Sequence, residues 1–263
     1  MAGLKVAISP FERRGFTRRA ASLSLAPRSR LETPDEEPDM DFMKMLRSLE
    51  ELLYEVMTWL VFYPRTFLLT LFQPLRTLEY SRAQFHRPEE EQFDQTLAPP
   101  LFLLLSLLLS HAIELGLHFD PFAASHGSLV RLSQQNLIIF RALVFAVFPL
   151  MFALRHLKVS GLKLSRSTLR GPFFVECYPA AVFAFLVGAG MTVANALPRA
   201  RVEGLLLAGG ATVWYLAVQA VWISQFDKRR WRGLVVALWQ WLKAMAIILA
   251  MALVYAFGGL ARA

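Results

Sequence analysis

Five long apolar stretches separated by polar loops constrain the fold of this chain more than any other feature of its sequence. The stretches are residues 97–117, 137–154, 173–197, 204–223 and 234–257. Each has about the 17–25 residues that an α-helix needs to cross a hydrocarbon layer roughly 30 Å thick. The chain of 263 residues is 56% hydrophobic, which is high for a soluble domain. We therefore expect an all-α, polytopic integral membrane helix bundle with about five transmembrane helices.

The distribution of Lys and Arg outside the apolar stretches predicts how the bundle is oriented. From the N-terminus onward, successive regions hold 13, 1, 5, 2, 4 and 1 such residues. Because cationic loops stay on the cytoplasmic side, we expect a bacterial inner (cytoplasmic) membrane protein with a cytoplasmic N-terminus and a periplasmic C-terminus. This arrangement also accounts for the formal net charge of +8 without nucleic-acid binding.

Composition divides the chain into four regions. Residues 1–40 are basic and then acidic, and are predicted to be a disordered tail, an organelle transit peptide or an over-long gene model upstream of a start at Met40. Residues 41–96 are predicted to form an amphipathic collar on the cytoplasmic face. The five-helix transmembrane domain is assigned to residues 97–258, and a short outer tail to residues 259–263.

The predicted collar begins with an amphipathic pattern. Apolar residues from Phe42 to Leu60 recur at steps of three and four, which is typical of a helix lying in the membrane surface or packed on a protein partner. Pro64 is expected to end this helix, because its ring removes a donor and clashes with the preceding turn. The apolar run 67–72 is too short to span a bilayer, so we expect it to be interfacial or re-entrant.

Four ionisable side chains lie within the apolar stretches. A charged group at mid-depth costs about 2.5–3.5 kcal/mol on insertion scales, so such groups usually pair or line a polar cavity. Glu114 and Arg141 match in depth near the outer side, and Glu176 and Lys243 match less closely near the cytoplasmic side. Each pair either fixes helix register or contributes to a polar translocation path.

His111, Glu114 and His118 are spaced to share one helix face. Two imidazoles and a carboxylate can hold a divalent metal or relay a proton, but at a helix end that faces the outside, interfacial histidines without a special role are ordinary. The single cysteine, Cys177, excludes an internal disulfide and is expected to pack inertly. Because the chain has no phosphate loop, GxSxG elbow or HExxH motif, we predict neither an enzyme nor a cofactor.

Small residues recur every fourth position in the third and fourth apolar stretches. In a bilayer, helices associate where small side chains let their backbones approach closely, so residues 173–197 are predicted to lie at the centre of the bundle. Pro149 and Pro179 are predicted to kink their helices, whereas Pro99 and Pro172 are expected at helix starts. The predicted packing residues are Ala180, Ala184, Gly188, Thr192, Gly204 and Ala208.

Two local sequences resemble the Yip family of membrane proteins. One is Phe62-Tyr63-Pro64-Arg65-Thr66-Phe67, a short proline-bounded apolar run. The other is the stretch 91–102, EQFDQTLAPPLF, which leads into the first crossing. The resemblance covers about residues 42–258. It implies a cytoplasmic N-terminal region followed by five crossings, as in bacterial members that are often labelled permeases without a known substrate. Eukaryotic members are linked to vesicle traffic and small GTPases, but their acidic and proline-glycine motifs are not evident here.

Three functional hypotheses follow from these observations. The first is a permease-like or transport-accessory protein of unknown substrate, with Glu114, Arg141, Glu176 and Lys243 as its polar bundle residues. The second is a non-transporting membrane organiser of the Yip type that recruits a partner or senses lipid. The third is a lipid-modifying enzyme. The expected partners are the lipid bilayer and either a second copy of the chain or another membrane protein, with no nucleic acid.

Overall fold

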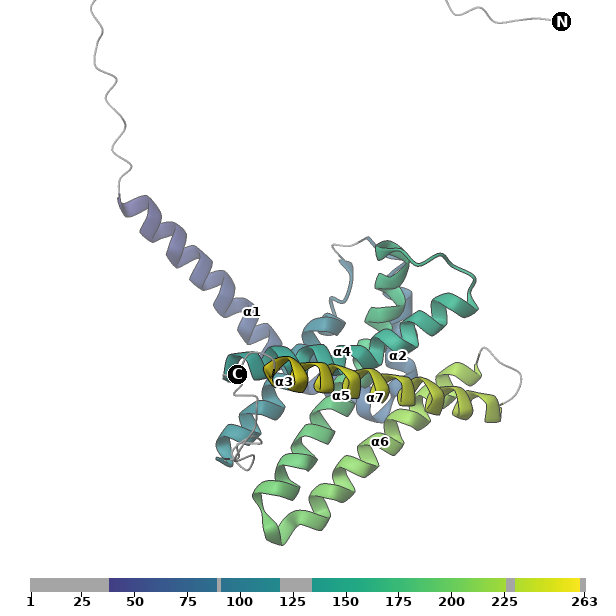
Figure 1. The fold of residues 1–263 in the computed structure, drawn as a ribbon. Helices are drawn as coiled ribbons and strands as arrows, with labels where there is room; N and C mark the ends of the chain where they lie inside the picture. Colours follow the sequence, from purple (N-terminus) through teal and green to yellow (C-terminus); the bar gives the residue numbers. More distant parts are fainter. Residues whose placement is uncertain (1–37, 89–90, 119–133, 226–229, 261–263) are drawn as a thin grey trace, which may run out of the picture. The chain divides into compact units, whose positions relative to one another are not determined.

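A computed structural model describes residues 38–88, 91–118, 134–225 and 230–260 (Figure 1). The chain divides into two units, residues 1–48 and 49–263. Within the first unit, the described residues 38–48 are helical. The second unit contains the remainder of α1 and all later helices. The helices are α1 (Pro38–Phe72), α2 (Pro74–Gln84), α3 (Pro99–Gly116), α4 (Gln134–Val159), α5 (Arg166–Ala196), α6 (Arg201–Ser224) and α7 (Arg230–Leu260).

The five helices from α3 to α7 are long and apolar enough to cross a membrane. The spans within them are Pro99–Gly116, Ile138–Val159, Arg166–Ala196, Pro198–Ser224 and Trp231–Val254. Helices satisfy all their backbone hydrogen bonds internally, which is what a chain segment requires inside lipid. The predicted fold class is confirmed: the chain is an all-α, multi-pass membrane helix bundle with five candidate spans.

Helix α5 lies at the centre of the bundle, as its small-residue pattern predicts. It packs against α2, α3, α4 and α6, whereas α7 packs against α6 and α4. In the apolar window of α5, 67% of the residues are buried within the chain, compared with 17% in α7. The sequence of α5 is therefore constrained by protein contacts, and that of α7 mainly by lipid.

Close backbone approach holds α5 to its neighbours. A Cβ atom added at Gly190 would lie 2.7 Å from the carbonyl oxygen of Gly204, and one at Gly188 would clash with the Ser110 hydroxyl. The predicted packing residues Ala180 and Ala184 are fully buried. These contacts place the small residues at the helix interfaces, where dispersion contacts between backbones replace the missing hydrophobic drive.

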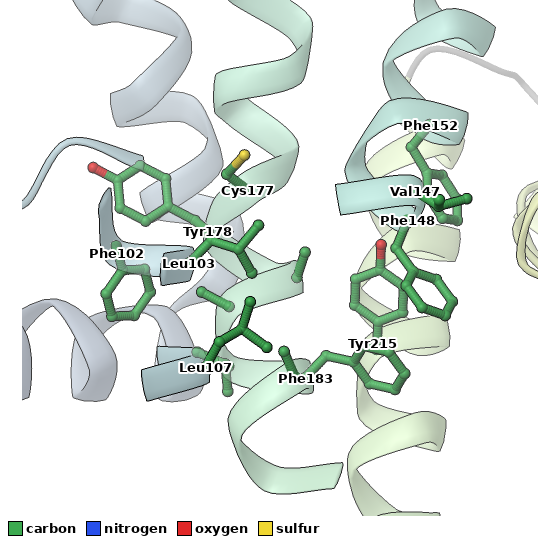
Figure 2. Close-up of a cluster of buried hydrophobic side chains, with 14 of the residues drawn as sticks. Phe102, Leu103, Leu107, Val147, Phe148, Phe152, Cys177, Tyr178, Phe183 and Tyr215 are labelled. Carbon is green, nitrogen blue, oxygen red and sulfur yellow. The ribbon is translucent and has the colours of Figure 1, made fainter. Parts of the chain in front are cut away.

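Aromatic side chains fill the space around α5. Figure 2 shows Phe102 and Tyr178 where α3 meets α5, and Phe148, Phe183 and Tyr215 where α4 and α6 meet it. The rings of Phe183 and Tyr215 stack with centroids 4.7 Å apart, and the ring of Phe148 meets that of Phe183 edge-on at 5.1 Å. Cys177 is a free, buried thiol within the same cluster.

The predicted effect of Pro64 is wrong, because α1 continues through it to Phe72. A proline inside a helix costs one hydrogen bond and a steric clash, but side chains on both sides of Pro64 are anchored to the bundle. The ring of Tyr63 lies 5.3 Å from that of Phe102, and the ring of Phe67 lies 5.2 Å from that of Phe185. Tertiary packing therefore preserves the helix. The apolar run 67–72 is the last turns of α1 rather than a separate element.

The predicted position of Pro172 at a helix start is also wrong, since α5 begins at Arg166. Ser165 and Thr168 form a capping box, in which the Ser165 hydroxyl accepts from the Thr168 amide at 3.2 Å and the Thr168 hydroxyl accepts from the Ser165 amide at 3.0 Å. This cap satisfies two backbone donors and extends the helix by two turns before Pro172. Pro99, in contrast, begins α3 as predicted.

Candidate functional site

The carboxylate of Glu114 joins three helices of the bundle. The Nη2 of Arg141 on α4 lies 2.7 Å from Oε1 of Glu114. The Nδ1 of His111, which is on α3 like Glu114, lies 3.2 Å from Oε2. Thr192 on α5 donates its hydroxyl to the same carboxylate at 3.3 Å. Glu114 is only 4% exposed. We call these four residues the Glu114 cluster.

The Glu114 cluster contains the ion pair that the matched depths of Glu114 and Arg141 suggested. Both carboxylate oxygens of Glu114 have partners, and these partners come from α3, α4 and α5. A buried carboxylate whose oxygens are all satisfied is held in one position, and removing a partner leaves it uncompensated. This geometry favours a structural role that fixes the register of the three helices.

His118 does not join this cluster. Helix α3 ends at Gly116, and His118 follows in a turn with φ of +52°, so the helical spacing that links it to Glu114 no longer applies. His118 is exposed, whereas His111 is buried. Across the described ranges, no group of three His, Cys, Asp or Glu side chains could hold a metal ion. The shared face predicted for the three residues therefore applies to His111 and Glu114 alone.

A second buried carboxylate, Glu176, lies near the start of α5. It is 5% exposed and accepts a hydrogen bond from the Nε2 of Gln219 on α6. Gln219 is fully buried, and its Oε1 and the nearby hydroxyl of Tyr215 have no hydrogen-bond partner. We call Glu176, Gln219 and Tyr215 the Glu176 cluster. Among the residues that the structure describes, this carboxylate is hydrogen-bonded only to a neutral amide.

The predicted pairing of Glu176 with Lys243 is wrong. Lys243 is exposed on α7, where its ammonium lies 5.4 Å from the centre of the Trp239 ring. Helix α7 packs against α6 and α4, whereas the Glu176 carboxylate on α5 is hydrogen-bonded to Gln219 on α6. Matched depth in the sequence gives the height of a side chain in the membrane but not its direction around the helix axis, and this is why the prediction failed.

Glu176 borders two small cavities that meet at His156 and Trp222. One cavity, of about 170 Å³, is also lined by Arg155 and Ser160, and the other, of about 180 Å³, by Arg82 and His86. The basic side chains come from α2, α4 and the turn after α2, at the end of the bundle where α4 finishes and α5 begins. The buried carboxylate therefore lies at the inner end of a cleft with a basic rim.

The two clusters lie at opposite ends of α5. Glu176 and Thr192 are sixteen positions apart in one helix, which corresponds to about 24 Å along its axis. Between them lie the buried side chains of Ala180, Phe183 and Ala184, with the ring of Phe148 packed against Phe183 (Figure 2). This conformation of the bundle separates the two polar clusters by a layer of apolar side chains.

Gln219 and the basic rim were missed by the sequence analysis. Tyr215 and Gln219 are four positions apart in an apolar stretch, so they share one helix face, and that spacing could have identified the face of α6 turned toward α5. No pattern within one helix indicates that Arg82 and Arg155 meet at the same cleft, because that depends on how α2 packs on α5. Comparison of the chain with protein families, curated proteins and solved structures finds no match.

Proposed function

We propose that this chain is a permease-like protein of the bacterial inner membrane, in which Glu176 is the polar group that a transported solute or its coupling proton reaches from the cytoplasm. The observation that carries the proposal is the buried Glu176 carboxylate, hydrogen-bonded to neutral Gln219 and open to a basic cleft. Ionisable groups inside membrane proteins are expensive and usually mark solute paths or proton relays. Glu114, whose charge is matched by Arg141, is assigned the structural role.

The packed layer between the two clusters supports an alternating mechanism rather than an open channel. Transport through such a bundle requires a second conformation in which the aromatic layer around Phe183 parts. A protein whose two states differ at one interior layer exposes its polar site to one side at a time. The guanidinium groups of Arg82 and Arg155 on the basic rim would attract anionic solutes to the cleft. The polar side chains Glu176 and Gln219 would then receive the solute's hydrogen-bond donors, or a proton.

Proton entry into vesicles tests this proposal. Purified protein is reconstituted into liposomes that contain the pH-sensitive dye pyranine, and an inside-negative potassium diffusion potential drives uptake. We expect wild-type vesicles to acidify faster than protein-free vesicles, and Glu176→Gln to lose most of the difference. Glu203→Gln, which neutralises an exposed carboxylate on α6, is the matched control and should behave as wild type. Unchanged uptake by Glu176→Gln would contradict the role of this residue.

The alternative function, a non-transporting organiser of the Yip type, is supported by a separate observation. Apolar side chains of α1 are exposed in the unit formed by residues 49–263, among them Leu49, Leu52, Leu53 and Met57, each at least half exposed. Such a surface suits a membrane interface or a protein partner. Wild-type vesicles that acidify no faster than protein-free ones would contradict transport of protons and favour this alternative.

A further inference from the structure

We propose that the cleft between α1, α2 and the segment before α3 binds the phosphate group of an anionic phospholipid. The cleft has a volume of about 240 Å³ and is distant in sequence from the Glu176 cluster. Its wall contains two guanidinium groups, three hydroxyl-bearing threonines, one phenol and two amides. The lining residues are Arg65, Thr66, Leu69, Gln73, Arg76, Thr77, Tyr80, Gln95 and Thr96.

The charge of this cleft is positive and is not balanced by its own wall. Arg65 and Arg76 both line it, and no carboxylate does. No ion pair joins either guanidinium to an acid in the described part of the chain, and the acid nearest in sequence to each, Glu55 for Arg65 and Glu79 for Arg76, is exposed. Two guanidiniums directed into one space repel each other, so an anion between them relieves that repulsion. Arginine forks are suited to phosphate oxygens.

One of the two arginines is already oriented. Its Nη1 donates to the Oε1 of Gln73 at 2.7 Å, which ties Arg76 to the junction between α1 and α2. Thr96, which also lines the cleft, is held by a 2.8 Å hydrogen bond with the hydroxyl of Tyr178. An ordered fork facing fixed hydroxyls loses less conformational entropy on binding an anion than a free surface arginine would.

The position of the cleft indicates a lipid as the source of the phosphate. Thr96 and Gln95 precede the first span, which begins at Pro99, so the cleft lies at the level where headgroups meet the hydrocarbon layer. Leu69 on α1 lines it, and Leu69 and its helix neighbours Leu68 and Phe72 are exposed by 36%, 52% and 74%. A phosphate in the cleft would therefore place the acyl chains of a phospholipid beside apolar side chains.

Ligand-dependent thermal stability of the detergent-purified chain tests the proposal. Phosphatidylglycerol, phosphatidylcholine and inorganic phosphate are added separately, and the unfolding midpoint is measured, since a ligand that binds only the folded state raises it. We expect phosphatidylglycerol to raise the midpoint more than phosphatidylcholine does, and Arg65→Gln/Arg76→Gln to lose that difference. Arg166→Gln, which removes an exposed charge at the start of α5, should retain it. If inorganic phosphate raised the unfolding midpoint as much as phosphatidylglycerol does, the cleft would be a phosphate site, but its assignment to a lipid would be overturned.

A second measurement covers the case in which the double variant fails to fold. Wild-type protein is treated with the arginine reagent phenylglyoxal, and modification of each arginine is followed by peptide mass spectrometry. We expect phosphatidylglycerol to protect Arg65 and Arg76 and to leave Arg166 reactive. Equal modification of Arg65 and Arg76 with and without lipid would overturn the proposal, as would a double variant that retains the full phosphatidylglycerol shift.

Discussion

At the scale of single residues, the two buried carboxylates in the described part of the chain, Glu114 and Glu176, have partners of different charge. Glu114 has a charged partner, Arg141, and further hydrogen bonds with His111 on its own helix and Thr192 on α5, whereas the hydrogen-bond partner of Glu176 is the neutral amide of Gln219. A buried ion pair contributes mainly to specificity, because any other packing of the helices would leave one of the two charges without its partner. A carboxylate with a neutral partner is instead free to gain or lose a proton or a solute contact.

The first prediction concerns Arg141→Leu. Removing the guanidinium leaves Glu114 buried without its charged partner, and breaking one side of a buried pair typically costs about 3–5 kcal/mol. We expect a large decrease in the unfolding midpoint of the detergent-purified protein. Replacing both residues, as in Glu114→Leu/Arg141→Leu, removes the uncompensated charge and should recover most of the stability. Equal stability of wild type and Arg141→Leu would exclude a structural role for the pair.

The second prediction concerns the pH dependence that Tyr63 contributes. Its phenol shares a 3.1 Å hydrogen bond with Ser106, and burial raises its pKa above the usual 10.0, although this hydrogen bond acts in the opposite direction. Because the folded-state pKa is the higher one, the neutral phenol contributes stability that is complete below pH 10 and is lost as the pH rises through the folded-state pKa.

Tyr63→Phe tests this dependence. The variant loses one hydrogen bond and should be less stable by about 0.5–1.5 kcal/mol near neutral pH. Above the usual phenol pKa of 10.0, the wild type loses the contribution of its neutral Tyr63, so the two unfolding midpoints should converge. A difference in unfolding midpoint that stays constant above pH 10 would show that the pKa of Tyr63 is the same in the folded and unfolded states.

At the scale of helices, α5 and α6 are held by backbone contact at a single crossing. A Cβ atom at Gly190 would lie 2.7 Å from the Gly204 carbonyl oxygen and 2.8 Å from the Ala208 nitrogen. Those neighbours are backbone atoms and cannot rotate away. Gly209 follows Ala208 on α6, and a Cβ atom added there would have no atom within 4 Å. The two glycines therefore provide a matched comparison on one pair of helices.

The third prediction uses this comparison. Gly190→Ala must separate α5 from α6 and should destabilise the bundle by about 1–3 kcal/mol, the usual cost of overpacking. Gly209→Ala fills open space and gains helix propensity of about 0.8–1.0 kcal/mol, so its stability should equal or exceed that of wild type. The unfolding midpoints of both variants in detergent are the measurement. Similar losses in both would mean that Gly190 is not a contact point.

The boundaries of the helices were only partly predictable from the sequence. The apolar stretch 173–197 gives the end of α5 to within one residue, because apolarity stops where the helix leaves the bundle. Its start at Arg166 depends on the Ser165–Thr168 capping box, which lies outside the apolar stretch. Pro64 gave the wrong end for α1, because the contacts of Tyr63 and Phe67 with Phe102 and Phe185 are absent from any local pattern.

At the scale of the whole molecule, the number of crossings was predictable and the pairing between them was not. Lipid requires that every spanning segment be a long apolar helix, so hydropathy alone gives five. Which residues meet depends on how each helix is rotated about its axis. Glu114 contacts Arg141 because the faces of α3 and α4 that carry them point toward each other, whereas Lys243 lies on an exposed face of α7.

The last prediction concerns the orientation of the molecule in the membrane. Successive antiparallel helices place the turn at Ser160 and Gln225, the residue after α6, on one side of the bundle, and the turn at Arg199 on the other. The alternating Lys and Arg counts predict that the first side is cytoplasmic. Single cysteines are introduced at these three exposed positions in a Cys177→Ala background, and cells are labelled with an impermeant maleimide.

We expect the cysteine at Arg199 to label in intact cells, and those at Ser160 and Gln225 to label only after the membrane is permeabilised. This result would place the basic cleft beside Glu176 in the cytoplasm, where the proposed solute enters, and the Glu114 cluster at the periplasmic end. The reverse pattern would keep the helix count but invert the direction of the proposed path. Labelling of all three positions from one side would contradict the antiparallel crossings of α5 and α6 themselves.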